Sequence, residues 1–268
     1  GISEGGYGSQ RLASYYADYW AGVGPMAGGE PLKNAPVENC ANLAFSFLTG
    51  AMDEGFYRNK LTGYTKTAFD SLQAKYAGRL MNHSADSLFR HRIELIPNCG
   101  HSIDYSLTTP WLKTYKRNPY PHTFMWEDYP MDGQRRQGFY NLYVMKRPKE
   151  ADGLKDASGE DRDYYEMDIK DNVIRLSVRK VTYQTVERDP VYGIDLKFTK
   201  SYHQASGGKW KIYLNDQLVD MNKPVTVFIN DRKAFEGKLV PRMEDMITSC
   251  MEYFDPCRVF PASVDVAL

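Results

Sequence analysis

The spacing of apolar residues changes near residue 138, and this change constrains the fold more than any other feature of the chain. Before it, the nearly continuous apolar run 41–50 and the shorter run 91–97 alternate with segments of helical spacing, such as 64–80. Such runs are typical of strands that are buried on both faces between helices. After it, apolar and polar residues alternate with a period of two, as in 174–179, which is typical of half-exposed antiparallel strands. The sequence therefore predicts an α/β layer followed by an all-β part.

We expect two domains, for which a chain of 268 residues is long enough. Residues 1–137 are predicted to form a parallel sheet with flanking helices. Residues 138–268 are predicted to form an antiparallel β-sandwich with one helix, which ends before Pro256. The residues expected to face the interior of the sandwich are Ile174, Leu176, Val178, Ile194, Leu196, Val225, Val227 and Ile229.

Composition and charge argue against several classes of function. Lys plus Arg and Asp plus Glu are equal at 34 each, so no overall field attracts nucleic acid, and nucleic-acid binding is not expected. No apolar run approaches the roughly 20 residues that cross a bilayer, so no membrane span is expected. The four cysteines, whose spacing suits no metal, are expected to be buried free thiols, although an oxidising compartment would permit disulfides. They are Cys40, Cys99, Cys250 and Cys257.

The first five residues, GISEG, fit the pattern G-x-S-x-G. In this pattern a strand turns sharply into a helix and presents the serine hydroxyl, and small residues two positions to either side let the backbone close. The backbone N–H of Glu4 would then lie at the start of a helix, where it can stabilise an oxyanion. A flexible glycine-rich end would also explain five such residues, so the interpretation depends on partners elsewhere in the chain.

Asp53 and His101 are the partners that a serine nucleophile at Ser3 needs. A base must take the serine proton, and an acid must hold the base in the correct tautomer. Each of the two residues directly follows a predicted buried strand, and a glycine precedes the histidine. We therefore expect the three side chains to converge at one end of the parallel sheet.

Other residues compete for these roles. Glu54 is a rival acid, Asp53 could instead cap a helix, and Asp104 is expected to fix its own loop. The remaining histidines are His83, His91, His122 and His203. The first two lie in a polar stretch and are expected to face solvent, and the last lies in the predicted sandwich. Only His101 follows both a strand and a glycine.

Three stretches, GISEGGYGSQRLASYYADYWAGVGPMAGG, GAMDEGF and PNCGHSIDY, together resemble the C-terminal half of an α/β-hydrolase. The likeness covers roughly residues 1–135 and is closest to serine esterases of the polyhydroxybutyrate depolymerase and esterase D type. It implies Ser3 as nucleophile, His101 as general base and acid, Asp53 as orienting acid, and the Glu4 N–H as an oxyanion donor. It also implies that no metal or organic cofactor is needed.

The second half is similar to the accessory β domain that follows such esterases in secreted bacterial proteins, which favours a periplasmic or secreted location. The substrate implied is a small ester or, for a chain with 20 tyrosines and four tryptophans, an acylated carbohydrate. Two alternatives remain open. One is a non-catalytic hydrolase remnant whose β-sandwich binds a protein or glycan partner, and the other is a peptidase of the same fold.

The resemblance implies further strands before the serine, so we expect the chain to be a fragment that hydrolyses esters only feebly. The segment 21–26 would then be an unpaired edge, and such edges pair with other chains. We expect a homodimer, or association with the missing N-terminal half. Light scattering should report the dimer. A monomer with ordinary esterase turnover that Ser3→Ala abolishes would contradict this expectation.

Overall fold

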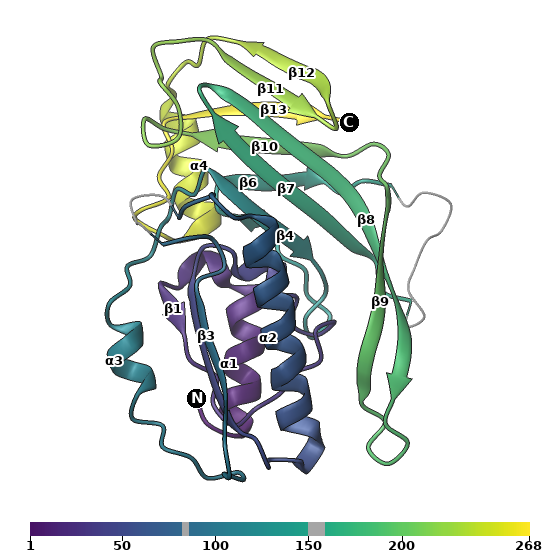
Figure 1. Cartoon of the computed structure of the whole chain (residues 1–268). Helices are drawn as coiled ribbons and strands as arrows, with labels where there is room; N and C mark the ends of the chain where they lie inside the picture. The colour runs from purple at the N-terminus through teal and green to yellow at the C-terminus, as the bar shows by residue number, and fades with distance from the viewer. Residues whose placement is uncertain (82–85, 150–158) are drawn as a thin grey trace. The chain divides into compact units, whose positions relative to one another are not determined.

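The computed structural model describes residues 1–81, 86–149 and 159–268, so His83 lies outside the described residues. The fold is mixed α/β, with more strands than helices and with open sheets that contain both parallel and antiparallel pairs (Figure 1). Within the described part of the chain, no helix is both long and apolar enough to cross a membrane.

The chain forms two compact units. The first comprises Gly1–Asn118 together with Tyr183–Thr199, and the second comprises Pro119–Thr182 and Lys200–Leu268. The first unit therefore contains a segment that lies far along the sequence, in the part where the period-two pattern dominates.

A parallel sheet of three strands, in the order β1-β2-β3, forms the centre of the first unit. All seven residues of β2 are buried, as its continuous apolar sequence predicts. The strands are β1 (Gly22–Val23), β2 (Ala44–Gly50) and β3 (His91–Ile96). The helices are α1 (Glu4–Tyr15), α2 (Arg58–Lys75) and α3 (Thr108–Leu112), with short 3-10 turns η1 (Ala17–Tyr19), η2 (Val37–Cys40) and η3 (Gly55–Tyr57).

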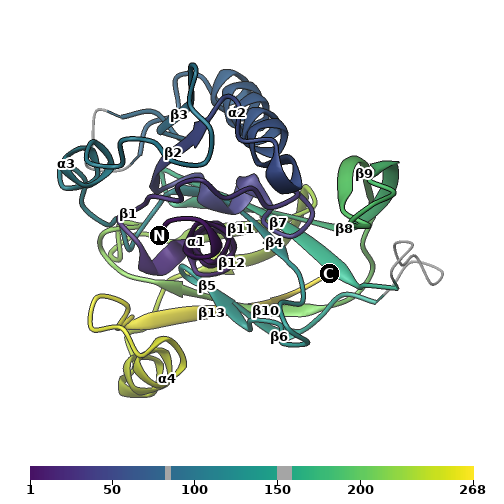
Figure 2. The same ribbon diagram turned by 90° about the horizontal axis from the view of Figure 1, so that it is seen from below.

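Helices α2 and α3 pack on opposite faces of this sheet (Figure 2). On one face the ring of Phe45 in β2 lies 4.6 Å from the ring of Phe69 in α2. On the other face Leu112 of α3 packs so closely over Gly22 that a Cβ there would lie 3.0 Å from its side chain. Strand β2 therefore supplies the contact with α2, and strand β1 supplies the contact with α3.

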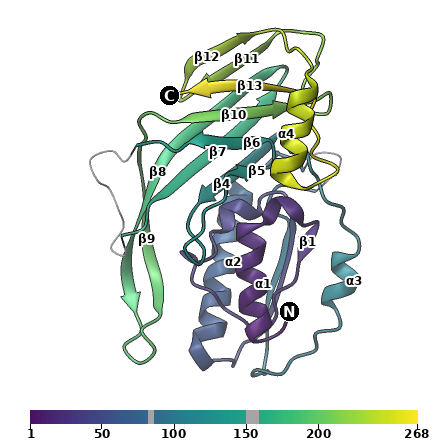
Figure 3. The same ribbon diagram turned by 180° about the vertical axis from the view of Figure 1, so that it is seen from behind.

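The second unit contains two sheets, which Figure 3 shows from behind. One has the order β13-β10-β6-β5, and the other has the order β12-β11-β8-β7-β4, with β9 paired to β8. Strands β8 and β9 are divided between the two units. The bounds are β4 (Thr123–Asp128), β5 (Gly138–Phe139), β6 (Leu142–Lys146), β7 (Arg162–Lys170), β8 (Val173–Arg188), β9 (Asp195–Gln204), β10 (Lys209–Leu214), β11 (Val225–Ile229), β12 (Arg232–Gly237), α4 (Met243–Tyr253) and β13 (Ala262–Ala267).

Most of the predicted interior residues of the β-rich part are buried. Of the eight, only Ile194 is half-buried, and it lies near the outer end of the β8–β9 hairpin. Between the two sheets the ring of Trp126 stacks on Phe139 at 5.3 Å, and the rings of Tyr165 and Trp210 meet edge to face at 6.1 Å. Large aromatic side chains therefore join the two sheets.

One strand pair departs from the predicted antiparallel pattern. Strand β11 pairs with β8 in parallel, from Thr226 opposite Val173 to Ile229 opposite Leu176. The chain passes through β9 and β10 before it returns as β11, and this crossover brings it back in the direction of β8.

Helix α4 forms where the spacing of Met246, Cys250 and Phe254 predicts a helix, but these residues are all exposed. The buried face carries Asp245, Ser249 and Tyr253 instead. Polar burial is possible because these side chains are hydrogen-bonded. The carboxylate of Asp245 accepts the hydroxyl of Ser263 at 2.6 Å, and the hydroxyl of Ser249 accepts the N–H of Phe260 at 2.9 Å.

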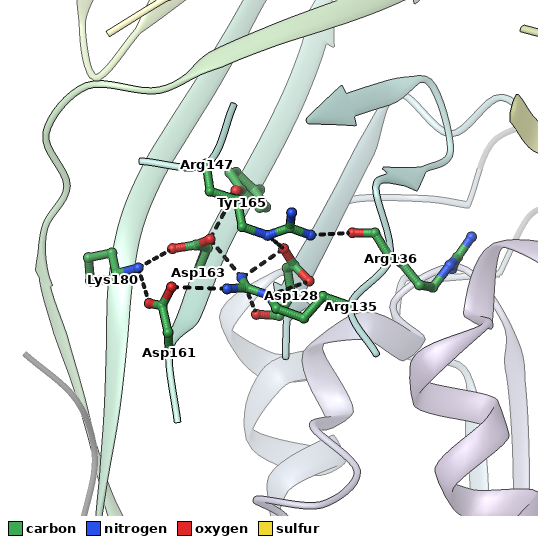
Figure 4. A network of polar contacts seen from close by, with 8 residues as sticks. All are labelled: Asp128, Arg135, Arg136, Arg147, Asp161, Asp163, Tyr165 and Lys180. Carbon is green, nitrogen blue, oxygen red and sulfur yellow. Dashed lines mark hydrogen bonds and ion pairs between the residues drawn. The ribbon is translucent and has the colours of Figure 1, made fainter. Parts of the chain in front are cut away.

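A buried charge network occupies the second unit (Figure 4). The guanidinium of Arg135 contacts the carboxylates of Asp128 at 2.7 Å, Asp163 at 2.7 Å and Asp161 at 3.1 Å. Lys180 pairs with Asp163 at 2.5 Å and also with Asp161. Burial raises the pKa of Asp128 to about 6, although the neighbouring arginines lower it. Arg135 is therefore the cation that three carboxylates share.

We predict that Arg135→Met lowers the free energy of unfolding by about 3–5 kcal/mol, because it leaves buried carboxylates without their shared cation. Urea unfolding followed by tryptophan fluorescence measures the loss. Lys233→Met is the control, since Lys233 and Glu236 form an exposed pair at 2.6 Å whose removal should cost less than about 1 kcal/mol. Equal losses in the two variants would contradict the role given to Arg135.

Candidate active site

Ser3 lies at a sharp turn between an extended segment and α1. Ile2 pairs in parallel with Met26, and Met26 pairs in parallel with Leu48 of β2, so the residue before the serine runs alongside the sheet. The N–H of Ser3 donates to the carbonyl oxygen of Met26 at 2.9 Å. Ser3 has φ 55° and ψ −118°, a conformation that is strained for a residue with a side chain, and α1 begins at Glu4. This is the strand–turn–helix context that the opening pattern requires.

Close packing at the turn depends on glycine at two positions. A Cβ at Gly1 would collide with the carbonyl of Gly5, and a Cβ at Gly6 would collide with the carbonyl of Met26. Gly5 differs, since among the described residues no atom outside its chain neighbours and its own helix backbone lies within 4 Å of a Cβ placed there. Of the two glycines in the five-residue pattern, only Gly1 therefore has no room for a side chain. The close approach expected at Gly5 is made by Gly6 instead.

Asp53 and His101 lie on loops that are joined at the end of the sheet. The N–H of Met52 donates to the carbonyl of Cys99 at 2.9 Å. A Cβ at Gly50 would collide with the carbonyls of residues 99 and 100, so glycine permits this approach. The two predicted residues thus come from the carboxyl ends of neighbouring parallel strands, β2 and β3.

The three predicted side chains form one hydrogen-bonded chain. Nδ1 of His101 lies 2.8 Å from Oδ2 of Asp53, and Nε2 lies 3.0 Å from Oγ of Ser3. A carboxylate only accepts hydrogen bonds, so Nδ1 carries the proton, and the lone pair of Nε2 faces the serine hydroxyl. The Asp53 side chain is 2% exposed, that of His101 is 44% exposed and Ser3 is half-buried. The acid is thus enclosed while the base and the hydroxyl remain accessible.

Arg58 also belongs to this site. Its Nε and Nη2 donate to the two oxygens of Asp53, at 2.9 and 2.5 Å. Burial by itself raises the pKa of Asp53, but the hydrogen bonds and charges of Arg58 and His101 outweigh it and hold this pKa below its usual value. The carboxylate is therefore ionised at neutral pH. Sequence reasoning missed Arg58, because an arginine at the first position of a helix has many ordinary explanations.

The competing acids have other surroundings. Glu54 is exposed, and its carbonyl accepts the N–H of Tyr57 at 2.9 Å. Asp104 accepts the N–H of Ser106 at 2.9 Å, which fixes the loop, as predicted. Hydrogen bonds from the side chain and then from the N–H of Ser106 lower the pKa of the Asp104 carboxyl. The hydroxyl of Tyr105 donates to the carbonyl of His101 at 2.7 Å and holds the same loop.

The competing histidines are engaged elsewhere. His91 was expected to face solvent, but its side chain is 8% exposed, with Nε2 3.0 Å from Asp70. The prediction failed because β3 carries this ring against α2, where it lies 5.2 Å from the ring of Phe69. In the second unit, His122 contacts the carbonyl of Gln217 at 2.9 Å, and His203 contacts the hydroxyl of Thr182 at 2.8 Å.

The described residues contain no group of three or more His, Cys, Asp or Glu side chains arranged to hold a metal ion. All four cysteines are free, as predicted. Cys40 is buried and Cys99 is half-buried, but Cys250 and Cys257 are exposed, so the expectation of burial was wrong for these two. Cys250 lies on the outward face of α4, which explains its exposure.

The geometry permits proton transfer from Ser3 to His101, with Asp53 beside the imidazolium that would form. The first N–H groups of a helix have no acceptor within the helix, so the N–H of Glu4, next to Ser3, can donate to an oxyanion. No protein-family model, curated protein or solved structure matches the chain. The functional interpretation therefore depends on the residues of the site themselves.

We predict that Arg58→Gln makes the protein more sensitive to acid. An Asp whose folded pKa is depressed adds stability that is fully present above its unfolded pKa of about 3.9 and is lost as the pH falls through the folded pKa. Without Arg58 the pKa of Asp53 rises, so this contribution shrinks and unfolding in acid begins at a higher pH. At neutral pH the loss should be about 3 kcal/mol, as for a broken buried pair.

Urea unfolding at a series of pH values measures both effects. Lys66→Gln is the control on the same helix, because Lys66 forms an exposed pair with Asp70 at 2.6 Å. An Arg58→Gln protein with the acid stability of this control would show that the guanidinium does not set the pKa of Asp53.

Proposed function

We propose that the protein is a serine hydrolase that cleaves carboxylic esters with Ser3, His101 and Asp53. The observation that carries the proposal is the chain of two hydrogen bonds, of 3.0 and 2.8 Å, that links the three side chains. Its support is that a strained serine, an accessible imidazole and a buried ionised carboxylate meet in the order that acyl transfer needs.

In acylation, Oγ of Ser3 attacks the ester carbonyl carbon while Nε2 of His101 takes the hydroxyl proton. The carbonyl oxygen becomes an oxyanion, which the N–H of Glu4 stabilises as a hydrogen-bond donor. Asp53 stabilises the imidazolium through the Nδ1 hydrogen bond. When the tetrahedral intermediate collapses, the bond to the alcohol oxygen breaks, His101 returns the proton to that oxygen, and the alcohol leaves an acyl-enzyme on Ser3.

Deacylation repeats these steps with water. His101 takes a proton from the water as its oxygen attacks the acyl carbon, and the proton then passes to Oγ of Ser3 as the acid is released. Every proton therefore moves through one imidazole, and no step in this sequence calls for a metal or organic cofactor.

We assign the first unit, on its resemblance, to the C-terminal half of an α/β-hydrolase, and the β-rich unit to an accessory β-sandwich domain. The parallel order β1-β2-β3, with Asp53 and His101 at the carboxyl ends of two of its strands, supports the first assignment. The aromatic layer between two sheets supports the second. The substrate class is a small ester or an acylated carbohydrate.

We predict that a fluorophosphonate probe labels the protein at Ser3 and that the protein hydrolyses p-nitrophenyl acetate. Ser3→Ala should abolish both, because it removes the hydroxyl that lies 3.0 Å from Nε2 of His101. Ser9→Ala is the matched control. Ser9 is on α1, which begins directly after Ser3, but its hydroxyl donates to the carbonyl of Gly5 at 2.6 Å, so both activities should persist.

Three other results would redirect the proposal. Absence of Ser3-dependent labelling and hydrolysis would favour a non-catalytic hydrolase remnant that binds a protein or glycan partner. Labelling in both serine variants would place the nucleophile elsewhere. Faster cleavage of p-nitroanilides than of p-nitrophenyl esters would identify a peptidase.

A further inference from the structure

The outer end of the β8–β9 hairpin (Tyr183–Thr199) belongs to the first unit, and Figure 1 shows it beside α2. It contacts the short segment that joins Asp53 to α2. The hydroxyl of Tyr57 donates to Oδ1 of Asp189 at 2.7 Å, and the ring of Phe56 lies 4.8 Å from the ring of Tyr192. The hairpin thus meets the two residues that directly precede Arg58.

Asp189 is 2% exposed, which is unusual for an aspartate in a hairpin turn. Both of its carboxylate oxygens are used, since Oδ1 accepts the hydroxyl of Tyr57 and Oδ2 accepts the N–H of Tyr192. Its N–H donates to the carbonyl of Ile194 at 2.8 Å, and its carbonyl accepts the N–H of Gly193 at 3.1 Å. This carboxylate therefore fixes the hairpin turn and holds Tyr57 at the same time.

Phe56 and Tyr57 both have left-handed backbones, with φ 50° and φ 60°. Such a conformation costs about 1–3 kcal/mol for each residue and persists only where the surroundings enforce it. The contacts with Asp189 and Tyr192 are made by these same two side chains. Because α2 begins at the next residue, these contacts lie directly beside the point from which Arg58 reaches Asp53.

A second set of contacts aligns the hairpin along α2. Glu187 accepts hydrogen bonds from Lys60 at 2.5 Å and from Lys197 at 3.1 Å, and Lys197 lies 5.3 Å from the ring centre of Tyr64. These side chains are one-third to one-half exposed, so each pair adds little stability. Their effect is to keep the hairpin in register with the first two turns of α2.

We propose that the outer end of the β8–β9 hairpin is a positioning element of the candidate active site and that Asp189 is its positioning residue. Asp189 holds Tyr57, Tyr57 sets the start of α2, and Arg58 then orients the carboxylate that holds the imidazole of His101. The inference rests on the proposed function and adds to it a segment that lies 82 to 98 positions beyond His101 in the sequence. Catalytic side chains must be held within about 0.5 Å of their productive positions, so residues that support them from behind affect the rate.

The test compares two variants with matched controls in the full chain. Tyr57→Phe removes only the hydroxyl, and Asp189→Asn removes the charge. Each should lower kcat for p-nitrophenyl acetate by about 10- to 100-fold with little change in KM, because misplacement by about 1 Å can cost roughly 10²-fold. The double variant should be no worse than the more severe single variant, because the two side chains act as one pair.

The controls make the same chemical changes elsewhere in the first unit. Tyr115→Phe removes a hydroxyl that accepts a hydrogen bond from Arg90 at 2.9 Å. Asp195→Asn removes a carboxylate from the same hairpin, where it pairs with Arg188 at 3.3 Å. Both controls should keep the kcat of the unmodified protein. Circular dichroism and urea unfolding of all four variants separate a misplaced site from an unfolded one.

A readout independent of turnover is the ring ¹⁵N spectrum of His101 in histidine-labelled protein. Tyr57→Phe and Asp189→Asn should shift these signals, and the control variants should not. If Ser3-dependent hydrolysis is present but the test variants match their controls in kcat and in the His101 signals, the positioning role is overturned and the proposed function stands. If the unmodified protein shows no Ser3-dependent labelling or hydrolysis, the proposed function fails, and the His101 signals alone decide whether the hairpin positions the pair of Asp53 and His101.

Discussion

The carboxylate of Asp53 binds both the guanidinium of Arg58 and the imidazole of His101, and the rest of the candidate site is arranged around it. The imidazole of His101 needs one of its oxygens as an acceptor, while Arg58 occupies both oxygens with a forked pair. The guanidinium cancels part of the negative potential that would stabilise an imidazolium. The same guanidinium fixes the plane of the Asp53 carboxylate and keeps it ionised although it is buried. Because that plane is fixed, the hydrogen bond to Nδ1 orients the imidazole toward Ser3.

The two units use arginine–carboxylate pairs in different ways. In the first unit one guanidinium serves one carboxylate, and an oxygen of that carboxylate still accepts a hydrogen bond from a half-exposed histidine. In the second unit Arg135 is shared by three aspartates, two of which also bind Lys180. Because burial makes an unpaired charge costly, such a network is constrained to remain neutral and fully hydrogen-bonded. The first arrangement leaves a group free for proton transfer, and the second holds strands together.

The main residues of the candidate site could be predicted from the sequence because each lies beside a strong local signal. Asp53 and His101 follow apolar runs, and parallel strands bring their carboxyl ends to one edge of a sheet. Arg58 could not be predicted, since it follows Phe56 and Tyr57, whose left-handed backbones are uncommon for residues with large side chains. The burial of Asp189 could not be predicted either, because an aspartate in a hairpin turn is normally exposed and the residues next to it in the sequence give no sign of burial.

The sequence by itself determined the buried strand β2, period-two strands such as β8 and the existence of helix α4, because periodicity and turn chemistry depend on neighbouring residues. Only the tertiary structure decided that α4 buries Asp245 and Ser249 while Met246 is exposed, that β11 runs parallel to β8, and that the hairpin end joins the first unit. Each of these depends on the free energy of contacts between segments that are distant in the chain. A local pattern predicts which residues of one segment can be buried together, but it does not identify the distant segment that packs against them.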